Sequence, residues 1–199
     1  MRILLVSLLY PLPTNAARGT FVADHALALK AQGHDVRIVN TLPRMMKYQE
    51  ARRSTLTGAA KAPKTFEHGG LEVFAPRFTT LPDHPFPGIT KWSVKRTTRS
   101  IEAWLGEWRP EAIVCHTLWP AGVLANHLSK RWAAPWAAVV HGWDIDVGLD
   151  HASVGPSVTA LLNKADHLVA VSKRLLQRAC EAGRNPDTCL LYTSPSPRD

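Results

Sequence analysis

The chain has 199 residues, 45% of them hydrophobic, which is enough for one well-buried α/β domain and too few for two. Its 3 cysteines form no C-x-x-C pair, so a disulfide framework and a thiolate zinc site are disfavoured and a reducing cytoplasm fits best. The formal charge of +8 favours an anionic partner, and the lack of zinc-finger, RNA-binding or helix-turn-helix patterns argues against nucleic acid.

The N-terminal part of the chain has the pattern of a strand, a helix and a second strand. Residues 2–7 are a short apolar run that soon reaches Pro11, which fits a buried strand better than a signal peptide. Residues 19–32 carry apolar side chains at helical spacing and are followed by Gly33, and residues 35–39 predict the next strand. Such a unit implies parallel strands joined by a right-handed crossover.

The middle of the chain is less regular. Residues 41–70 contain prolines, a Gly-Gly pair and many basic side chains, which we interpret as a long excursion with one short helix at residues 47–53. Residues 71–75 predict a third strand, and residues 91–108 predict a single amphipathic helix. On the outer face of that helix we expect the cations Lys95, Arg96 and Arg99 to gather beside Trp92, and we call these four residues the cationic group.

The rest of the chain alternates between strands and helices. The predicted strands are residues 112–115, 136–140 and 167–171, and the predicted helices are residues 120–130, 156–164 and 172–182. This alternation predicts an α/β fold with a Rossmann-like, doubly wound parallel sheet and helices on both faces. Ligands of such sheets bind beyond the carboxyl ends of the strands, so the residues that follow each strand are the candidates for a site.

The first strand is followed by Gly19 and Thr20, which open the first helix. The free amides at a helix start, beside a residue without a side chain, can hold a phosphate oxygen, although Gly19 can equally serve only a tight turn. A dinucleotide site is disfavoured because it needs G-x-G-x-x-G here and an acidic residue where this chain has Asn40. The Walker pattern of nucleotide triphosphatases is absent as well.

Other polar side chains follow the later strands. His141 and Asp144 come after a buried run, and an imidazole followed by glycine can approach a ligand and exchange a hydrogen bond near neutral pH, or can be a hydrogen-bonded structural histidine. His116 follows the preceding strand, but the spacing does not support a metal site made with His141 and Asp144. Ser172 follows the last strand, where it can cap the next helix and border the ligand edge.

Three segments carry a resemblance to a known family: RGTFVADHALALKAQGHDVRIV, VVHGWD and LVAVSKRLLQRA. Together they resemble the N-terminal, acceptor-side domain of the retaining glycosyltransferases of family 4, whose GT-B fold has two facing Rossmann-like domains. The resemblance implies that a sugar is transferred from a nucleotide sugar, with Gly19 near the donor phosphates, His141 against the donor sugar and Asp144 beside its hydroxyls. Many members have two glycines where this chain has Arg18 and Gly19.

The resemblance also bears on domains and partners. We expect residues 1–187 to form the domain, residues 188–199 to be a non-native or disordered tail, and the donor-binding domain, with its Arg/Lys pair and E-x7-E motif, to be absent. The fragment alone is then expected to be inactive, with a nucleotide sugar as donor, a glycan or lipid-linked acceptor, and no cofactor or metal.

Two other functions remain open at this point. One is a stand-alone protein that binds a phosphorylated sugar or glycolipid without turnover, and the other is half of a sugar-nucleotide epimerase. The cationic helix face and the basic excursion suggest that a cytoplasmic protein docks on the inner face of an anionic membrane, with a solvated helix face as the alternative.

Overall fold

The computed structural model describes residues 1–44, 56–80 and 87–192. In chain order the elements are β1 (Arg2–Ser7), α1 (Thr20–Ala31), β2 (Asp35–Asn40), β3 (Leu42–Pro43), β4 (Thr65–His68), β5 (Leu71–Phe74), β6 (Arg77–Phe78), α3 (Pro87–Arg96), α4 (Thr98–Leu105), β7 (Ala112–His116), α5 (Ala121–Trp132), β8 (Trp136–Val140), the π-helical turn η2 (Asp144–Gly148), α6 (Gly155–Leu162), β9 (His167–Ala170), α7 (Lys173–Glu181), the short turn η3 (Pro186–Thr188) and β10 (Cys189–Leu191). The expected short helix at residues 47–53 lies outside the described residues.

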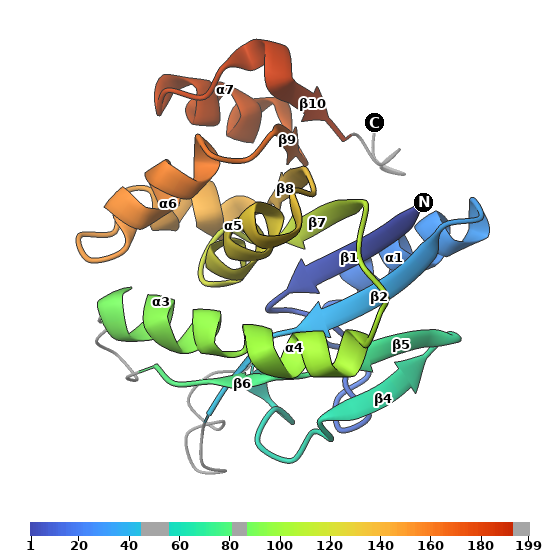
Figure 1. Ribbon diagram of the computed structural model, residues 1–199. Coiled ribbons are helices and arrows are strands. Elements are labelled where there is room, and N and C mark those ends of the chain that lie inside the picture. The colour runs from blue at the N-terminus through green and yellow to red at the C-terminus, as the bar shows by residue number, and fades with distance from the viewer. Residues whose placement is uncertain (45–55, 81–86, 193–199) are drawn as a thin grey trace.

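The central layer is an eight-stranded sheet in the order β10-β9-β8-β7-β1-β2-β5-β4 (Figure 1). All neighbouring pairs in it are parallel except β4 and β5, and β3 and β6 form a separate parallel pair. The chain moves outward from β1 in both directions, first to β2 and later to β7. This confirms the predicted doubly wound, Rossmann-like sheet.

The two faces of the sheet are covered by different helices. In β1, Leu4 and Val6 contribute to the larger core, which also contains buried side chains of α3 to α7. Ile3 and Leu5 point to the other face, where they pack with Val22 and other buried residues of α1. Because side chains alternate along a strand, one apolar run serves both cores. The prediction of helices on both faces is therefore confirmed.

The sheet has a topological switch point between β1 and β7. At their carboxyl ends, Ser7 of β1 lies in register with Asn40 of β2 on one side and with His116 of β7 on the other. The connections that leave β1 and β7 cover opposite faces, which opens the position where ligands of such sheets bind.

Two regions differ from the sequence-based expectations for the middle of the chain. Residues 65–68 were assigned to the excursion but form β4, because Gly69 and Gly70 have φ of 59° and 70° and close a hairpin onto β5. The single helix expected at residues 91–108 is two helices, α3 and α4. At Thr97 both the amide and the hydroxyl donate to the carbonyl of Val94, which interrupts the regular i−4 pattern.

The C-terminal boundary also differs. The domain was expected to end at residue 187, yet Cys189–Leu191 form β10, which extends the sheet in parallel with β9. The apolar sequence Cys-Leu-Leu suits an edge strand, and the free edge of β9 supplies its hydrogen-bonding partner. Residues 193–199 of the expected tail lie outside the described part of the chain.

Candidate functional site

The first loop and the start of α1 lie at the carboxyl edge of the sheet. Gly19 has φ of 60°, and a Cβ atom placed on it would lie 2.7 Å from main-chain atoms of Leu9 and Tyr10. Glycine is therefore required by the close passage of the chain's own loop. The exposed Thr20 begins the helix, whose first amides have no acceptor within the helix. The phosphate contact of Gly19 and Thr20 stays a prediction.

Arg18 holds this loop from within. Its side chain is only 5% exposed, and its guanidinium donates to the carbonyl of Tyr10 at 2.9 Å and to that of Leu8. Burial, together with the nearby Arg77, lowers the pKa of Arg18 to about 10, so the group is still charged at pH 7. A buried cation thus holds the loop directly before Gly19.

Three imidazoles meet at the switch point. Nδ1 of His25 lies 2.9 Å from Nε2 of His116, and Nδ1 of His116 lies 3.2 Å from Nε2 of His141. Phe21 packs against His141 with ring centroids 4.7 Å apart. We call His25, His116 and His141 the three-histidine chain. The sequence reasoning placed His116 and His141 at this edge but missed His25, whose signal was its i+4 spacing from Phe21 on α1.

The three imidazoles are neutral at pH 7. Burial and the neighbouring histidines lower the pKa of His116 to about 2, and burial with the nearby His25 lowers that of His141 to about 4. Burial also lowers the pKa of His25. Burial beside other imidazoles favours the uncharged form of His141, and its predicted hydrogen bond to a ligand stays a prediction. The three-histidine chain is thus a set of neutral hydrogen-bonding groups.

Asp144 lies beneath this edge and connects two loops. It is 1% exposed, and its carboxylate accepts from the amide of Leu118 at 2.7 Å and from that of His141 at 3.4 Å. Burial raises its pKa to about 6, although the amide bonds oppose the shift. Thr117, which directly follows His116 in the first of these loops, has φ of 72°, a strained value for a β-branched residue. Asp144 thus positions the loops of His116 and His141, and its direct contact with a ligand hydroxyl stays a prediction.

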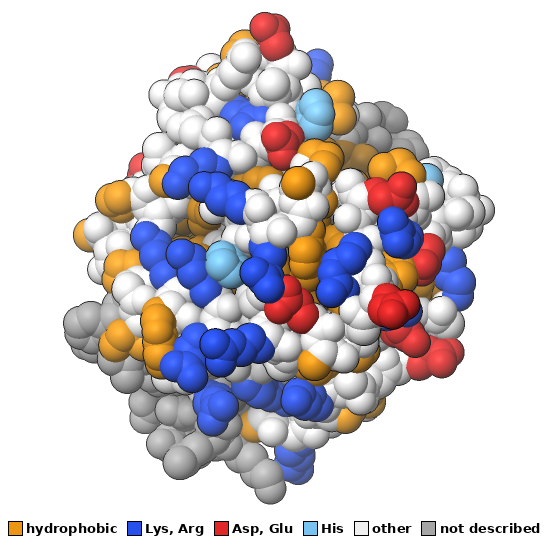
Figure 2. All heavy atoms as spheres, in the orientation of Figure 1, with side chains coloured by type: hydrophobic (Ala, Val, Ile, Leu, Met, Phe, Trp, Pro, Cys, Tyr) orange, Lys and Arg blue, Asp and Glu red, His pale blue; other side chains and the backbone are white. Residues whose placement is uncertain are grey.

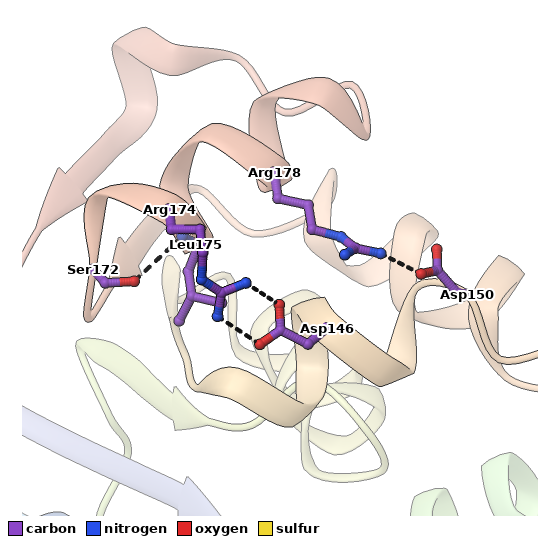
Figure 3. Close-up of polar contacts among 6 residues, drawn as sticks. All are labelled: Asp146, Asp150, Ser172, Arg174, Leu175 and Arg178. Atoms are coloured by element: carbon purple, nitrogen blue, oxygen red, sulfur yellow. Dashed lines mark hydrogen bonds and ion pairs between the residues drawn. The ribbon is translucent and has the colours of Figure 1, made fainter.

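Ser172 follows the carboxyl end of β9 and begins α7 (Figure 3). The Ser172 hydroxyl accepts from the amide of Leu175 at 3.3 Å, which confirms the predicted cap. Arg174 binds both carboxylate oxygens of Asp146, at 2.6 and 2.7 Å, and so ties α7 to η2. A second pair, Arg178 with Asp150, lies farther along α7 and supports the same arrangement (Figure 3).

The histidines and carboxylates at this edge are the residues that could ligate a metal ion. Within residues 1–44, 56–80 and 87–192, no three or more His, Cys, Asp or Glu side chains are placed to hold a metal ion. Both ring nitrogens of His116 are engaged with other histidines, and the carboxylate of Asp144 is engaged with amides. These side chains are thus held in place by hydrogen bonds within the protein.

The chain is similar in fold to several solved structures of larger proteins. The UDP-GlcNAc 2-epimerase from Methanocaldococcus jannaschii has a TM-score of 0.59 at 11% identity, covering 96% of this chain and 45% of that one. The lipopolysaccharide outer core galactosyltransferase WaaB gives 0.58 at 12%, covering 98% and 46%. HepE of Anabaena, solved with UDP and glucose, gives 0.54 at 15%, covering 97% and 44%. The chain thus spans less than half the length of each.

Sequence comparison gives a narrower result. A search of curated proteins found no match. The sequence profile described as "Glycosyl transferase 4-like domain" matches residues 18–191, a segment that includes α1, the three-histidine chain and β10. This match covers most of the chain, and the resemblance deduced from the sequence segments is confirmed. The chain therefore belongs to the family of glycosyl transferase 4-like domains.

Proposed function

We propose that this chain is the acceptor-side domain of a retaining glycosyltransferase, which moves a hexose from a nucleotide sugar to a glycan or lipid-linked acceptor in polysaccharide biosynthesis. The observation that carries the proposal is the three-histidine chain, which ends at His141 beside the switch point of a family 4-like domain. HepE, a protein of similar fold, was solved with UDP and glucose, which supports a nucleotide-sugar donor.

The proposed roles follow from position. His141 hydrogen-bonds a hydroxyl of the donor sugar, and the amides at Gly19 and Thr20 face the donor phosphates. Asp144 and Ser172 hold the loops around the donor. The protein's part in such a reaction is to orient the acceptor and stabilise the departing diphosphate, which amides and cationic side chains can do without a metal or cofactor.

The donor phosphates need more partners than this chain offers. We propose that a second Rossmann-like domain, with the E-x7-E motif, supplies them, and that the 199-residue chain alone has little or no transferase activity. Sequencing the source DNA beyond the codon for Asp187 tests this. A reading frame that continues into such a domain is expected, and a stop codon or an unrelated domain would overturn the proposal.

In a protein that contains both domains, His141→Ala tests the role of the histidine. Loss of one hydrogen bond to the sugar is expected to lower kcat/KM by about 10- to 100-fold. His167→Ala is the matched control, because His167 is an exposed histidine at the start of β9, away from the carboxyl edge. Equal effects of the two substitutions, measured as release of nucleoside diphosphate, would contradict the role of His141.

The similarity to UDP-GlcNAc 2-epimerases keeps one alternative in view. An epimerase interconverts free nucleotide sugars and needs no acceptor, so an NMR assay of the nucleotide sugar without acceptor distinguishes the two reactions. A stand-alone binding protein is distinguished by calorimetry of this chain with UDP-, GDP- and ADP-glucose. The transferase proposal expects no binding tighter than about 1 mM, or about 4 kcal/mol, from this domain alone.

The location that we propose is the cytoplasmic face of an anionic membrane. In the described part of the chain, no helix has the length and apolar character to cross a bilayer. The cationic group expected on one helix lines a cavity of about 540 Å³ between α3, α4 and α5, where Arg131 and His127 of α5 join it. Figure 2 shows Lys and Arg side chains gathered over these helices.

This cavity combines a cationic wall with an exposed aromatic ring. The side chain of Trp92 is 58% exposed, and the guanidinium of Arg96 lies 4.6 Å from the centroid of its ring. Ile89, one helical turn earlier on α3, is 44% exposed. Exposed Trp and Ile beside cations are typical of a surface that contacts anionic lipid headgroups and the adjoining apolar layer.

Vesicle sedimentation tests this surface. The chain is expected to sediment with vesicles that contain phosphatidylglycerol and to remain in solution with phosphatidylcholine alone. Substituting Arg96→Glu together with Arg99→Glu should abolish the difference, whereas Lys164→Glu with Lys173→Glu, an equal charge change on exposed residues near α6 and α7, should preserve it. Binding that is independent of anionic lipid would overturn the proposed location.

A further inference from the structure

The three-histidine chain has the geometry of two consecutive hydrogen bonds. The ring centroids of His25 and His116 are 5.1 Å apart, and those of His116 and His141 are 5.5 Å apart. Each separation exceeds the corresponding nitrogen–nitrogen distance by about two ring radii, so the facing nitrogens lie close to the line between the ring centres. A proton between them therefore lies in a nearly linear N–H···N bond.

The middle ring couples the other two. His116 is 2% exposed and directs both ring nitrogens at histidines, and a neutral imidazole has one N–H donor and one acceptor. If His116 donates to His141, it must accept from His25. If it accepts from His141, it must donate to His25. Any other arrangement leaves two lone pairs or two protons facing each other in a buried place, which costs at least a lost hydrogen bond.

Only two proton arrangements satisfy both bonds, and in each all three rings carry the same tautomer. With every proton on Nδ1, the bonds run from His25 toward His141, and Nδ1 of His141 is a donor. With every proton on Nε2, the bonds run the other way, and Nδ1 of His141 is an acceptor. Among the described residues, Nδ1 of His141 has no hydrogen-bond partner, so it is the atom left for a ligand.

The groups around the three-histidine chain do not favour either direction of its hydrogen bonds. Phe21 packs on His141 and tilts against His116 with an apolar ring. Asp144 accepts from the main-chain amide of His141, so the nearest buried carboxylate is not bonded to any of the three rings. The free imidazole of histidine prefers its proton on Nε2, and with no opposing partner this preference is summed over three rings.

We propose that His25 and His116 are positioning residues that keep the proton of His141 on Nε2, so that Nδ1 of His141 accepts a hydrogen bond from a hydroxyl of the donor sugar. This inference rests on the proposed function for the identity of the ligand. It adds that the site selects a sugar with a free hydroxyl donor at that position and rejects an ether or a deoxy analogue there. His25, which is 91 residues from His116 in sequence, thus decides the polarity of a contact that it does not make.

Nitrogen-15 NMR of the 199-residue chain tests the proposal without any ligand. Long-range proton–nitrogen correlation distinguishes the two tautomers, and all three residues are expected to carry the proton on Nε2. The variant His25→Lys replaces the first ring with a group that can only donate, so His116 and His141 are both expected to move their protons to Nδ1. The exposed His167 is the internal control and should keep its tautomer.

Each outcome decides a part of the proposal. A proton on Nδ1 of His141 in the unsubstituted chain overturns the acceptor role, and unlike tautomers at His116 and His141 overturn the coupling, even if the Lys variant does not fold. Because neither measurement involves sugar transfer, a negative result leaves the proposed function in place. Conversely, a two-domain protein that shows the expected tautomers but transfers no sugar would overturn the proposed function alone.

Discussion

The lowered pKa values of the histidines at the switch point lead to a prediction of how the free energy of unfolding depends on pH. The pKa of His116 is about 2 and that of His141 about 4 in the folded chain, against 6.5 for an unperturbed histidine. Lowered histidine pKa values mean that the unfolded chain binds more protons, so their stabilising effect is complete above pH 6.5 and declines as the pH falls below it. Asp144 acts in the opposite sense, because its pKa is raised from 3.8 to about 6.

The magnitude follows from counting protons between pH 6 and pH 5. Unfolding takes up a proton at each of His116 and His141 and releases one from Asp144, a net uptake of about one proton. The free energy of unfolding should then fall by about 1.4 kcal/mol for each pH unit, with His25 adding to the loss. Carboxylates with lowered pKa, such as Asp146, lose their contribution at lower pH.

Urea unfolding followed by tryptophan fluorescence at several pH values measures this slope. In His116→Gln nearly one proton of the uptake is removed, so the slope should fall by about 1.2 kcal/mol per pH unit, whereas His167→Gln changes an exposed histidine and should leave it unchanged. A free energy of unfolding that stays constant or rises from pH 6 to pH 5 in the unsubstituted chain would refute the assignment of neutral, buried imidazoles.

Two further predictions concern stability. Gly19→Ala should lower the free energy of unfolding by more than about 2 kcal/mol, because a left-handed backbone and a close main-chain contact both oppose a side chain. Gly33→Ala is the control and should cost about 1 kcal/mol, because Gly33 has φ of 84° but nothing within 4 Å of the added Cβ atom. Equal urea midpoints for the two variants would contradict this prediction. Arg184→Met should cost about 3 kcal/mol, because its guanidinium is buried and bonded to several main-chain carbonyls. By contrast, Arg174→Met removes a largely exposed ion pair and should cost less than about 1 kcal/mol, which thermal denaturation can check.

Much of the fold was predictable from the sequence. The periodicity of residues 2–39 placed β1, α1 and β2 within about a residue of their bounds, because strand and helix patterns and a Gly at a helix end are local signals. The alternation of the later segments predicted the parallel sheet, and the sheet in turn put His116, His141 and Gly19 at one edge. Ser172 was readable as a cap for the same local reason.

Other features depend on contacts between distant segments. The break at Thr97 arises from a side chain competing for a main-chain carbonyl, and β10 forms because the edge of β9 is free; neither has a strong local pattern. From the sequence, Gly19 could serve a phosphate contact or only a tight turn. The structure shows that main-chain atoms of Leu9 and Tyr10 pass so close to Gly19 that packing alone requires glycine there.

The sequence by itself determined that this chain is a doubly wound α/β domain of the glycosyl transferase 4-like family, because hydrophobic periodicity and short motifs are written locally. Only the tertiary structure decided the chemistry of the candidate site. Placing β7 beside β1 and α1 above them brings His25 to His116, which buries His116 and partly buries His25, favours neutral imidazoles and couples their protons. Burial and long-range hydrogen bonding are properties of the assembled sheet, and no local pattern in the chain encodes them.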